Sequence, residues 1–585
     1  MPIRLHVLAS AARHAVSSSV LVCRLIAFHL TPLLLHLSYF LAVDLLGSLA
    51  LVLLKPSKPG YQPRYVDVFF MSTSAVTVTG LATVEMEDLS SAQLVVLTLL
   101  MLLGSEMFVS LLGLVLESSR KQQQQRESHQ DHDSRVMAAA VRDEPDLEEA
   151  NDPAAPSADS SGDGGDRKES CRSVRTLALV VSAYMAAILV VGSVLVFAYV
   201  ATVPTARDVL ARKRINAALF SVSTTVSSFT NGGLLPTNES MAVFAANRGL
   251  LLLLAAQILA GSTLLPVFLR LAVGATRGLA RALFLFTERG GPVEELVPMD
   301  MEKSAAAAGF GHLLPSGSRA ASLAATVVAV AAAAATLLCC LNWNSAVFAG
   351  LTAGEKLTNA VFMAVNVRQA GENSVDCSLV APAVLVLFLA MMSVTLLRAK
   401  LKHTTRQHVV RSLRDFACQP TTFRCIPASA TFFSAHDDGG ERKRSGAGEP
   451  ECRDGAEKKK RRLSLNSMLL SPLACNAAAV MLACITERRS ITVDPLNFST
   501  FNVIFEELLK LTYGFLHACS AYGNVGLSTG YSCSRLPPAA EEATAACHDK
   551  PYSFSGWWSD QGKLLLVLLM LYGRLKGFHG QRRRR

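Results

Sequence analysis

Eight apolar runs, each about twenty residues long, dominate this chain, and about twenty apolar residues are what a helix needs to cross a bilayer. They cover roughly residues 29–54, 91–117, 176–203, 248–274, 319–341, 378–398, 467–486 and 562–576. A soluble chain of 585 residues would carry more charge than the 17% found here beside 51% hydrophobic residues. The sequence therefore predicts an all-α, multi-pass membrane protein with eight transmembrane helices.

The polar connections between these runs predict the topology. If the spans alternate in direction, three long connections and both termini lie on one side, and each of these connections carries Lys and Arg. The positive-inside rule then makes that side cytosolic. The basic run Lys458–Arg462 also has the composition of a nucleic-acid patch. In a chain with eight spans, the topological explanation is favoured and no nucleic-acid partner is predicted.

The spans and connections divide the chain into four repeats and three linkers. The predicted order is an N-terminal segment with repeat A (1–118), a polar cytosolic linker (119–173), repeat B (174–275), a cytosolic linker (276–318), repeat C (319–398), a basic cytosolic linker (399–465) and repeat D (466–585). Each repeat contains a span, a loop and a second span. The repeats share little sequence beyond their loops, so the pattern rather than sequence identity indicates them.

Each loop between paired spans carries a glycine after a stretch long enough for a short helix. The glycine segments are Ser74–Leu81, Ser228–Leu234, Asn366–Glu372 and Ser520–Leu527, and the preceding helices are expected over 65–75, 215–227, 356–365 and from 498 onward. Non-helical backbone at membrane depth survives only inside protein or beside a watery cavity. Four re-entrant loops around one axis would place carbonyl oxygens in a central pore, and the carbonyl ends of the short helices would favour a cation. The alternative is four unrelated tight turns.

The loop motifs resemble those of a known family. The stretches Phe69–Glu87, Thr224–Met241, Ile485–Phe501 and Ser520–Ser532 are similar to the Trk/Ktr/HKT superfamily, and within it to the plant high-affinity potassium transporter (HKT) group. The resemblance implies channel-like transport of sodium and potassium ions across the plasma membrane, without enzymatic activity or a cofactor. It also implies a homodimer with one pore per subunit. Its selectivity-filter glycines correspond to Gly80, Gly233, Gly371 and Gly526, with Thr79, Asn231, Gly232 and Asn524 as neighbours.

Two cues about ion preference conflict. Family members with serine at the first filter position resemble sodium-selective transporters, whereas this chain has glycine there, at Gly80. Four filter glycines would provide four nearly equivalent carbonyl contributions, which can replace the hydration shell of potassium as well as sodium. We therefore predict that both ions permeate. The rest of the sequence resembles the sodium-transporting branch, so a sodium-selective uniporter is the alternative.

Charged residues and cysteines add further candidates. By resemblance, Lys563 and Arg574 in the last span face the pore or contact neighbouring loops, where they would form an electrostatic barrier. Arg574 could instead reach the cytosolic interface. Asp44, in the first span, is expected in a buried pair or hydrogen bond. Cys533 and Cys547 flank an outward-facing polar stretch and are the predicted disulfide.

Other classes of membrane protein fit the sequence less well. No phosphate-binding loop or pump motif supplies energy for active transport, and the histidines lie mostly in the linkers rather than in pairs at span ends. A receptor would not need four glycine loops between spans. The stretch 507–519 separates the fourth pore helix from its glycine motif, unlike in the family, so a non-conducting accessory protein is a third hypothesis.

Overall fold

The computed structural model describes residues 32–58, 60–119, 122–123, 163–286, 302, 305, 310–311, 313–367, 370–388, 391–392, 480–499, 502–503, 505, 520–531, 533 and 552–582. Within these ranges all regular structure is helical and there is no β-strand. The described part of the chain therefore has the all-α architecture that the apolar runs predict.

Five predicted spans are occupied by long apolar helices. Three helices could each cross a bilayer alone, judged by length and composition: α2 (Pro32–Leu53), α6 (Asp163–Thr202) and α12 (Gly317–Asn342). Two further spans are bent pairs, α4 (Ser91–Gly104) with Glu106–Ser119 and α9 (Arg248–Ile258) with α10 (Leu265–Phe286). Outward-facing side chains such as Leu46, which is 68% exposed, are those expected of helices surrounded by lipid.

The other three predicted spans are not among these five. Residues 378–398 and 467–486 lie partly outside the described residues. The last predicted span, 562–576, is part of α22 (Asp560–Arg582), which carries Lys563 and Arg574 and is not one of the five apolar spans. The eight-span layout therefore remains a prediction, whereas a multi-pass helical membrane protein is established.

Short helices precede three of the four glycine segments, as the loop pattern predicts. They are α3 (Tyr65–Val76), α8 (Ala217–Thr230) and α13 (Ala353–Asn366). The fourth segment contains α20 (Ser520–Gly523), and the helix expected from residue 498 onward lies mostly outside the described residues. Local chemistry explains where they begin. The Asn216 side chain accepts hydrogen bonds from two backbone N–H groups at the start of α8, and a Thr352–Glu355 capping box starts α13. The remaining short elements are α7 (Pro204–Lys213), α18 (Arg488–Val493) and single 3₁₀ turns, such as Met86–Asp88.

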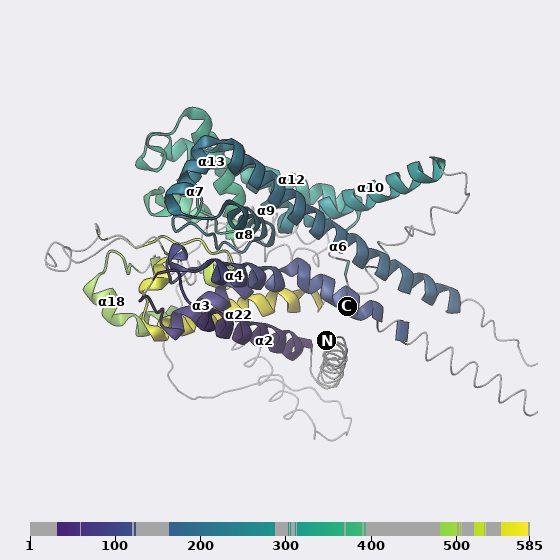
Figure 1. Ribbon diagram of the computed structural model, residues 1–585, viewed down its shortest axis with the longest axis horizontal. Helices are drawn as coiled ribbons and strands as arrows, with labels where there is room; N and C mark the ends of the chain where they lie inside the picture. The colour runs from purple at the N-terminus through teal and green to yellow at the C-terminus, as the bar shows by residue number, and fades with distance from the viewer. Residues whose placement is uncertain are drawn as a thin grey trace, which may run out of the picture. The chain divides into compact units, whose positions relative to one another are not determined.

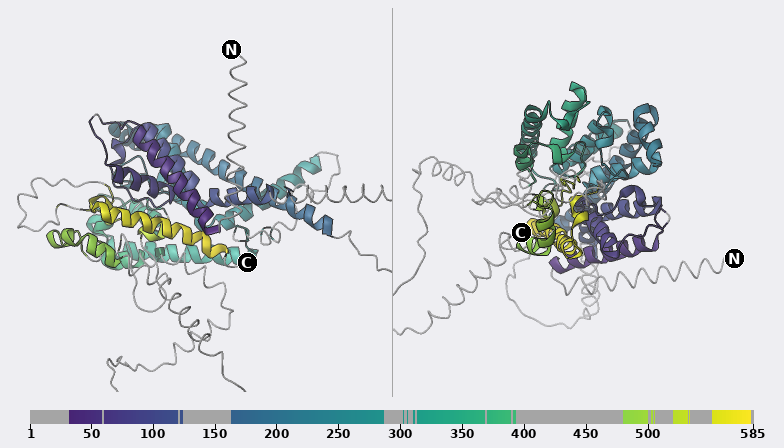
Figure 2. Two further views of the ribbon diagram at one scale, coloured as in Figure 1. Left: turned by 90° about the horizontal axis from the view of Figure 1, so that it is seen from below. Right: turned by 90° about the vertical axis from the view of Figure 1, so that its left-hand side faces the viewer.

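The short helices α3, α8 and α13 are called pore helices here after their predicted role. Each packs against the spans of its own predicted repeat. In the first repeat, α2, α3 and α4 lie side by side with α22 (Figure 1), and Figure 2 shows the yellow α22 beside the purple N-terminal helices. In the second repeat α8 contacts α6 and α9, and in the third α13 contacts α12. Contacts of α4 with α8, and of α9 with α13, connect consecutive repeats. This packing holds the pore helices close to one another.

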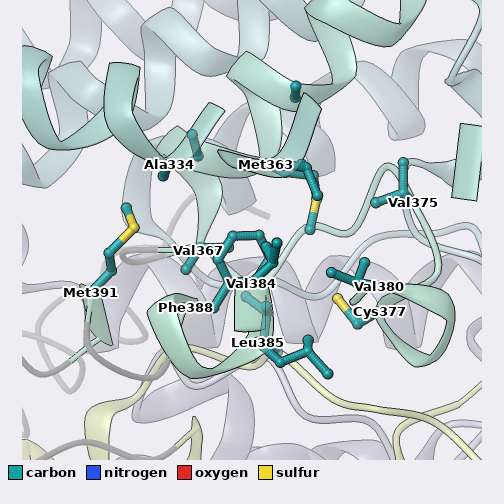
Figure 3. Close-up of a cluster of buried hydrophobic side chains, with 14 of the residues drawn as sticks. Ala334, Met363, Val367, Val375, Cys377, Val380, Val384, Leu385, Phe388 and Met391 are labelled. Atoms are coloured by element: carbon teal, nitrogen blue, oxygen red, sulfur yellow. The ribbon is translucent and has the colours of Figure 1, made fainter. Parts of the chain in front are cut away.

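Buried side chains hold the third pore helix in place. Met363 and Val367, at the end of α13, pack in one cluster with Val384 and Phe388 from the segment that follows the loop (Figure 3). The same cluster includes Val525 beside Gly526 of the fourth loop. Burial of these side chains therefore fixes the third and fourth loops relative to each other.

The second spans of the first two repeats break at glycines that touch the pore helices, although the apolar runs 91–117 and 248–274 read as continuous spans. A Cβ on Gly104 would overlap the backbone of Val76, and a Cβ on Gly261 would overlap that of Phe229. Val76 and Phe229 each lie four residues before a loop glycine. The helix axes bend by 56° at the first break and by 85° at the second. Close backbone contact, which only glycine permits, thus accounts for both positions.

In each of the first two repeats, a tyrosine from the first span bonds to the broken helix. The Tyr39 hydroxyl donates to the carbonyl of Leu103 at 2.9 Å, and the Tyr184 hydroxyl donates to that of Ala260 at 2.9 Å. Leu103 and Ala260 directly precede the two break glycines. A helix break frees carbonyl groups that lipid cannot satisfy, so each hydroxyl compensates for a lost backbone hydrogen bond.

Replacing either tyrosine with phenylalanine should lower the free energy of unfolding by about 1–2 kcal/mol, because a buried carbonyl loses its donor while the ring packing is retained. The two losses should add, since the tyrosines lie in different repeats. Thermal unfolding of the purified protein in detergent measures both. Tyr65→Phe is the control, because Tyr65 is 58% exposed. A loss of unfolding free energy no larger than that of the control would mean that the tyrosine hydroxyls do not stabilise the helix breaks.

Candidate functional site

All four loop glycines adopt a backbone conformation that other residues avoid. Their φ angles are +88° at Gly80, +71° at Gly233, +64° at Gly371 and +79° at Gly526. Glycine enters this left-handed region without steric cost because it has no Cβ. The same unusual geometry therefore occurs at the equivalent position of each predicted repeat.

The four glycines form a closed ring of neighbours. A Cβ on Gly80 would lie 2.9 Å from the Cα of Gly233, and a Cβ on Gly233 would lie 2.6 Å from the carbonyl oxygen of Ala370, beside Gly371. A Cβ on Gly371 would lie 3.0 Å from the Cα of Gly526 and would overlap the carbonyl oxygen of Val525. A Cβ on Gly526 would lie 2.9 Å from the Cα of Gly80. Segments from the whole length of the chain thus meet at one place.

Three of the four turns share one hydrogen-bonding pattern. The residue two before the glycine is left-handed, with φ of 58° at Val78, 62° at Asn231 and 53° at Asn524. The next residue donates its backbone N–H to a serine carbonyl five residues earlier; these bonds are Thr79 to Ser74 at 2.8 Å, Gly232 to Ser227 at 2.7 Å and Val525 to Ser520 at 3.0 Å. This is the Schellman ending of a helix, which turns the chain sharply away from the helix axis.

The third turn is built differently. Its Ala370 N–H donates to Asn366 O at 2.9 Å, and Val365 occupies the position held by serine in the other three turns. The hydroxyls of Ser74, Ser227 and Ser520 are buried without a hydrogen-bond partner in the described structure. The ring therefore combines three similar turns with a distinct one.

The predicted neighbours of the glycines lie in the same ring. The Asn524 side chain donates to Thr79 Oγ1 at 2.7 Å, which ties the fourth turn to the first. Asn231 is buried at its left-handed position, a conformation that asparagine tolerates better than most residues. A side chain at Gly232 would overlap Met101 of α4. All four predicted neighbours are thus brought to this site.

Glu372, which directly follows Gly371, is a residue of this site that the sequence motifs did not predict. Its side chain is fully buried, and its two carboxylate oxygens lie 3.0 and 2.9 Å from the Ser228 hydroxyl of α8. The Asn366 side chain bonds to both the backbone N–H and the carbonyl of Glu372, at 2.8 and 2.6 Å. The available signal was the one acidic residue of the segment Asn366–Glu372, whose other charged residue is Arg368.

Lys563 contacts a pore helix, one of the two locations that the family resemblance implies. Its Nζ lies 2.6 Å from Asp67 Oδ1 on α3, and the Lys563 side chain is only 2% exposed. Arg64, which is 60% exposed, approaches the other oxygen of Asp67 at 3.2 Å. The Lys563–Asp67 ion pair therefore attaches the last helix to the first pore helix.

Arg574 reaches the break in the second span. Its guanidinium donates to the carbonyl of Gly104 at 2.5 Å, next to the carbonyl that Tyr39 binds. Asp44, in α2, accepts a buried hydrogen bond from Thr73 of α3 at 2.8 Å, which joins two helices. Polar side chains of the spans thus bind both the first pore helix and the broken span beside it.

An ion-pair cluster connects the loops that follow the first two glycines. Lys213 lies 2.6 Å from Glu87 and 2.6 Å from Glu239, and Glu87 and Asn238 each donate a backbone N–H to a side-chain oxygen of the other. Burial lowers the pKa of Lys213, but the hydrogen bonds to Glu239 and Glu87 outweigh burial and leave this pKa above its ordinary value. Lys213 therefore stays charged and links the two loops.

Only one cysteine of the predicted disulfide lies among the described residues. Cys533 is disulfide-bonded, whereas Cys547 lies outside the described residues. The stretch 507–519 also lies outside them. The pairing of Cys533 with Cys547 remains a prediction.

Comparisons with known proteins relate this architecture to ion transport. Residues 161–544 match the model of the TrkH family, described as a cation transport protein. A rice protein named cation transporter HKT2;4 is 55% identical over 575 residues, or 98% of each chain, and the probable cation transporter HKT2;3 of rice is 53% identical over the same shares. The sodium transporter HKT1 of Arabidopsis thaliana is 34% identical over 90% of each chain.

Proposed function

Because this chain belongs to the plant HKT family of the Trk/Ktr/HKT cation transporter superfamily, we propose that it conducts sodium and potassium ions through a pore formed by its own four repeats. It is a membrane transporter of monovalent cations and not an enzyme. The finer proposal concerns the filter, the mechanism and the ion preference. One observation carries it, namely the closed ring of left-handed glycine turns.

The ring is suited to replacing the hydration shell of a cation. Backbone carbonyls from four turns can coordinate an ion that has shed its water, and glycine provides the φ angles that such turns require. The C-terminal ends of α3, α8 and α13 lead directly into these turns and carry partial negative charge. We assign the filter to Gly80, Gly233, Gly371 and Gly526, with ions moving down their electrochemical gradient.

The names of the relatives support cation transport, and Gly80 supports permeation of both ions. Identity is 55% and 53% with the two rice proteins named cation transporters, and 34% with the Arabidopsis protein named a sodium transporter. Gly80 leaves the first turn without a side chain, so all four turns can contribute comparably. We further propose that the protein lies in the plasma membrane with eight spans and cytosolic termini, and that each subunit of a homodimer holds its own pore.

The test is the reversal potential in oocytes expressing this chain. With sodium alone, potassium alone and mixtures outside, the reversal potential should follow both ions. Gly80→Ser should shift the permeability ratio towards sodium, because the serine Cβ would press on Gly232 O and Gly233 Cα, each 2.9 Å away. That distorts one quarter of the coordination shell.

Two outcomes would favour the alternative hypotheses. A reversal potential that follows sodium alone in the unmutated chain favours the sodium-selective uniporter and places the determinant outside Gly80. Full surface expression without current favours the non-conducting accessory protein. Gly274→Ser is the control variant, since nothing lies within 4 Å of a Cβ at Gly274, and it should leave the permeability ratio unchanged.

A further inference from the structure

Glu372 is a buried acidic side chain whose described partners carry no charge. Its carboxylate is completely buried and accepts from the Ser228 hydroxyl, while Asn366 bonds only to its backbone. Among the residues that the structure describes, no Lys, Arg or His forms an ion pair with it. An ionised carboxylate in this setting is very unfavourable unless a positive charge lies nearby.

The surroundings add to this electrostatic penalty. Ser228 lies in the last turn of α8, and the C-terminal end of a helix carries partial negative charge that disfavours an anion. Yet Glu372 is held in place, because Ser228 of one pore helix donates to its carboxylate and Asn366 of the next bonds to its backbone. Glu372 also follows Gly371 directly, so its backbone is part of the ring of glycine turns. A cation in that ring would supply the positive charge that no ion pair among the described residues provides.

We propose that Glu372 supplies the fixed negative charge of the filter, with its ionised carboxylate balanced by the monovalent cation that occupies the ring. This inference rests on the proposed function and names a residue that sets how strongly the filter binds cations. The carboxylate acts through space and is not itself an ion ligand. Its charge raises the occupancy of sodium and potassium alike, whereas the carbonyl geometry distinguishes one ion from the other.

The decisive variant is Glu372→Gln, which keeps the size of the side chain and an acceptor for Ser228 and removes the charge. The half-saturating concentrations of sodium and potassium currents should both rise at least roughly tenfold, the effect expected for losing one charge within about 12 Å of an ion at an effective dielectric constant of about 20. Glu372→Asp keeps the charge and should stay close to the unmutated protein in half-saturating concentration. Asp208→Asn removes an exposed acidic charge on α7 and is the matched control.

A binding measurement makes the result independent of current. Sodium or potassium should raise the thermal unfolding midpoint of the purified unmutated protein relative to choline, and Glu372→Gln should lose most of that rise. Cation currents in the unmutated chain with unchanged concentration dependence in Glu372→Gln would overturn the inference and leave the proposed function standing. A cation-dependent rise that Glu372→Gln abolishes, in a chain without current, would support the inference while the proposed function fails.

Two further results would also overturn the role of Glu372. One is a Glu372→Asp variant whose half-saturating concentrations rise as much as those of Glu372→Gln, since shape rather than charge would then matter. The other is the absence of any cation-dependent rise in midpoint in the unmutated protein, together with absence of current, since no cation would then occupy the ring.

Discussion

Gly371→Val should abolish cation current while the protein still reaches the cell surface. The φ of +64° at Gly371 is strongly disfavoured for a β-branched residue, and the new Cβ would overlap the carbonyl oxygen of Val525 and lie 3.0 Å from the Cα of Gly526. The turn can relieve this only by moving backbone carbonyls out of the ring. Current and surface labelling, measured on the same cells, separate lost conduction from lost expression.

Gly350→Val is the matched control for this experiment. Gly350 has a φ of +76°, so valine there meets the same backbone strain, but nothing lies within 4 Å of its Cβ. The control should therefore keep most of its current after correction for surface protein. Normal current through Gly371→Val would remove that residue from the proposed filter, and equal losses in the two variants would mean that strain alone is responsible.

Lys563→Met should lower the free energy of unfolding by about 3 kcal/mol and strongly reduce the amount of folded protein. Removing one member of a buried ion pair leaves the other charge uncompensated, and Lys563 is only 2% exposed beside Asp67. Arg64 still approaches Asp67 at 3.2 Å, which keeps the expected loss at the lower end of the range for such pairs. Thermal unfolding in detergent measures the loss.

The partner variant distinguishes charge from packing. Lys563→Met combined with Asp67→Leu should recover much of the lost stability, because no buried charge is then left without a partner. Lys58→Met is the surface control, since Lys58 is 64% exposed and 3.7 Å from Asp88, and it should cost about 0.5 kcal/mol or less. A double variant less stable than Lys563→Met would show that the ion pair is not the cause.

The loop glycines and the helices before them were predictable because both follow from local rules. A glycine that ends a short apolar helix between two spans is visible in the sequence, and α3, α8 and α13 fall within about three residues of the expected bounds. Lys563 was recognisable because a charge in an apolar span is costly. What its charge pairs with was not predictable, since Asp67 lies nearly five hundred residues earlier in the chain.

Features that depend on contacts between repeats could not be found in the same way. The breaks at Gly104 and Gly261 arise because another backbone approaches them, and transmembrane helices contain many glycines that mark no break. Glu372 was not predicted as a site residue, because its burial depends on contacts with another pore helix, such as that with Ser228. The left-handed Val78 contradicts the preference of its residue type, so tertiary packing must impose that conformation.

The distinct third turn has a consequence for how such a ring can change over evolutionary time. In an assembly of four identical chains, a single codon change alters four positions at once. Here one chain provides all four turns, and the Ala370–Asn366 bond of the third turn differs from the pattern of the others. In the proposed filter each mutation therefore modifies a single quadrant, so ion preference could be adjusted in small, independent steps.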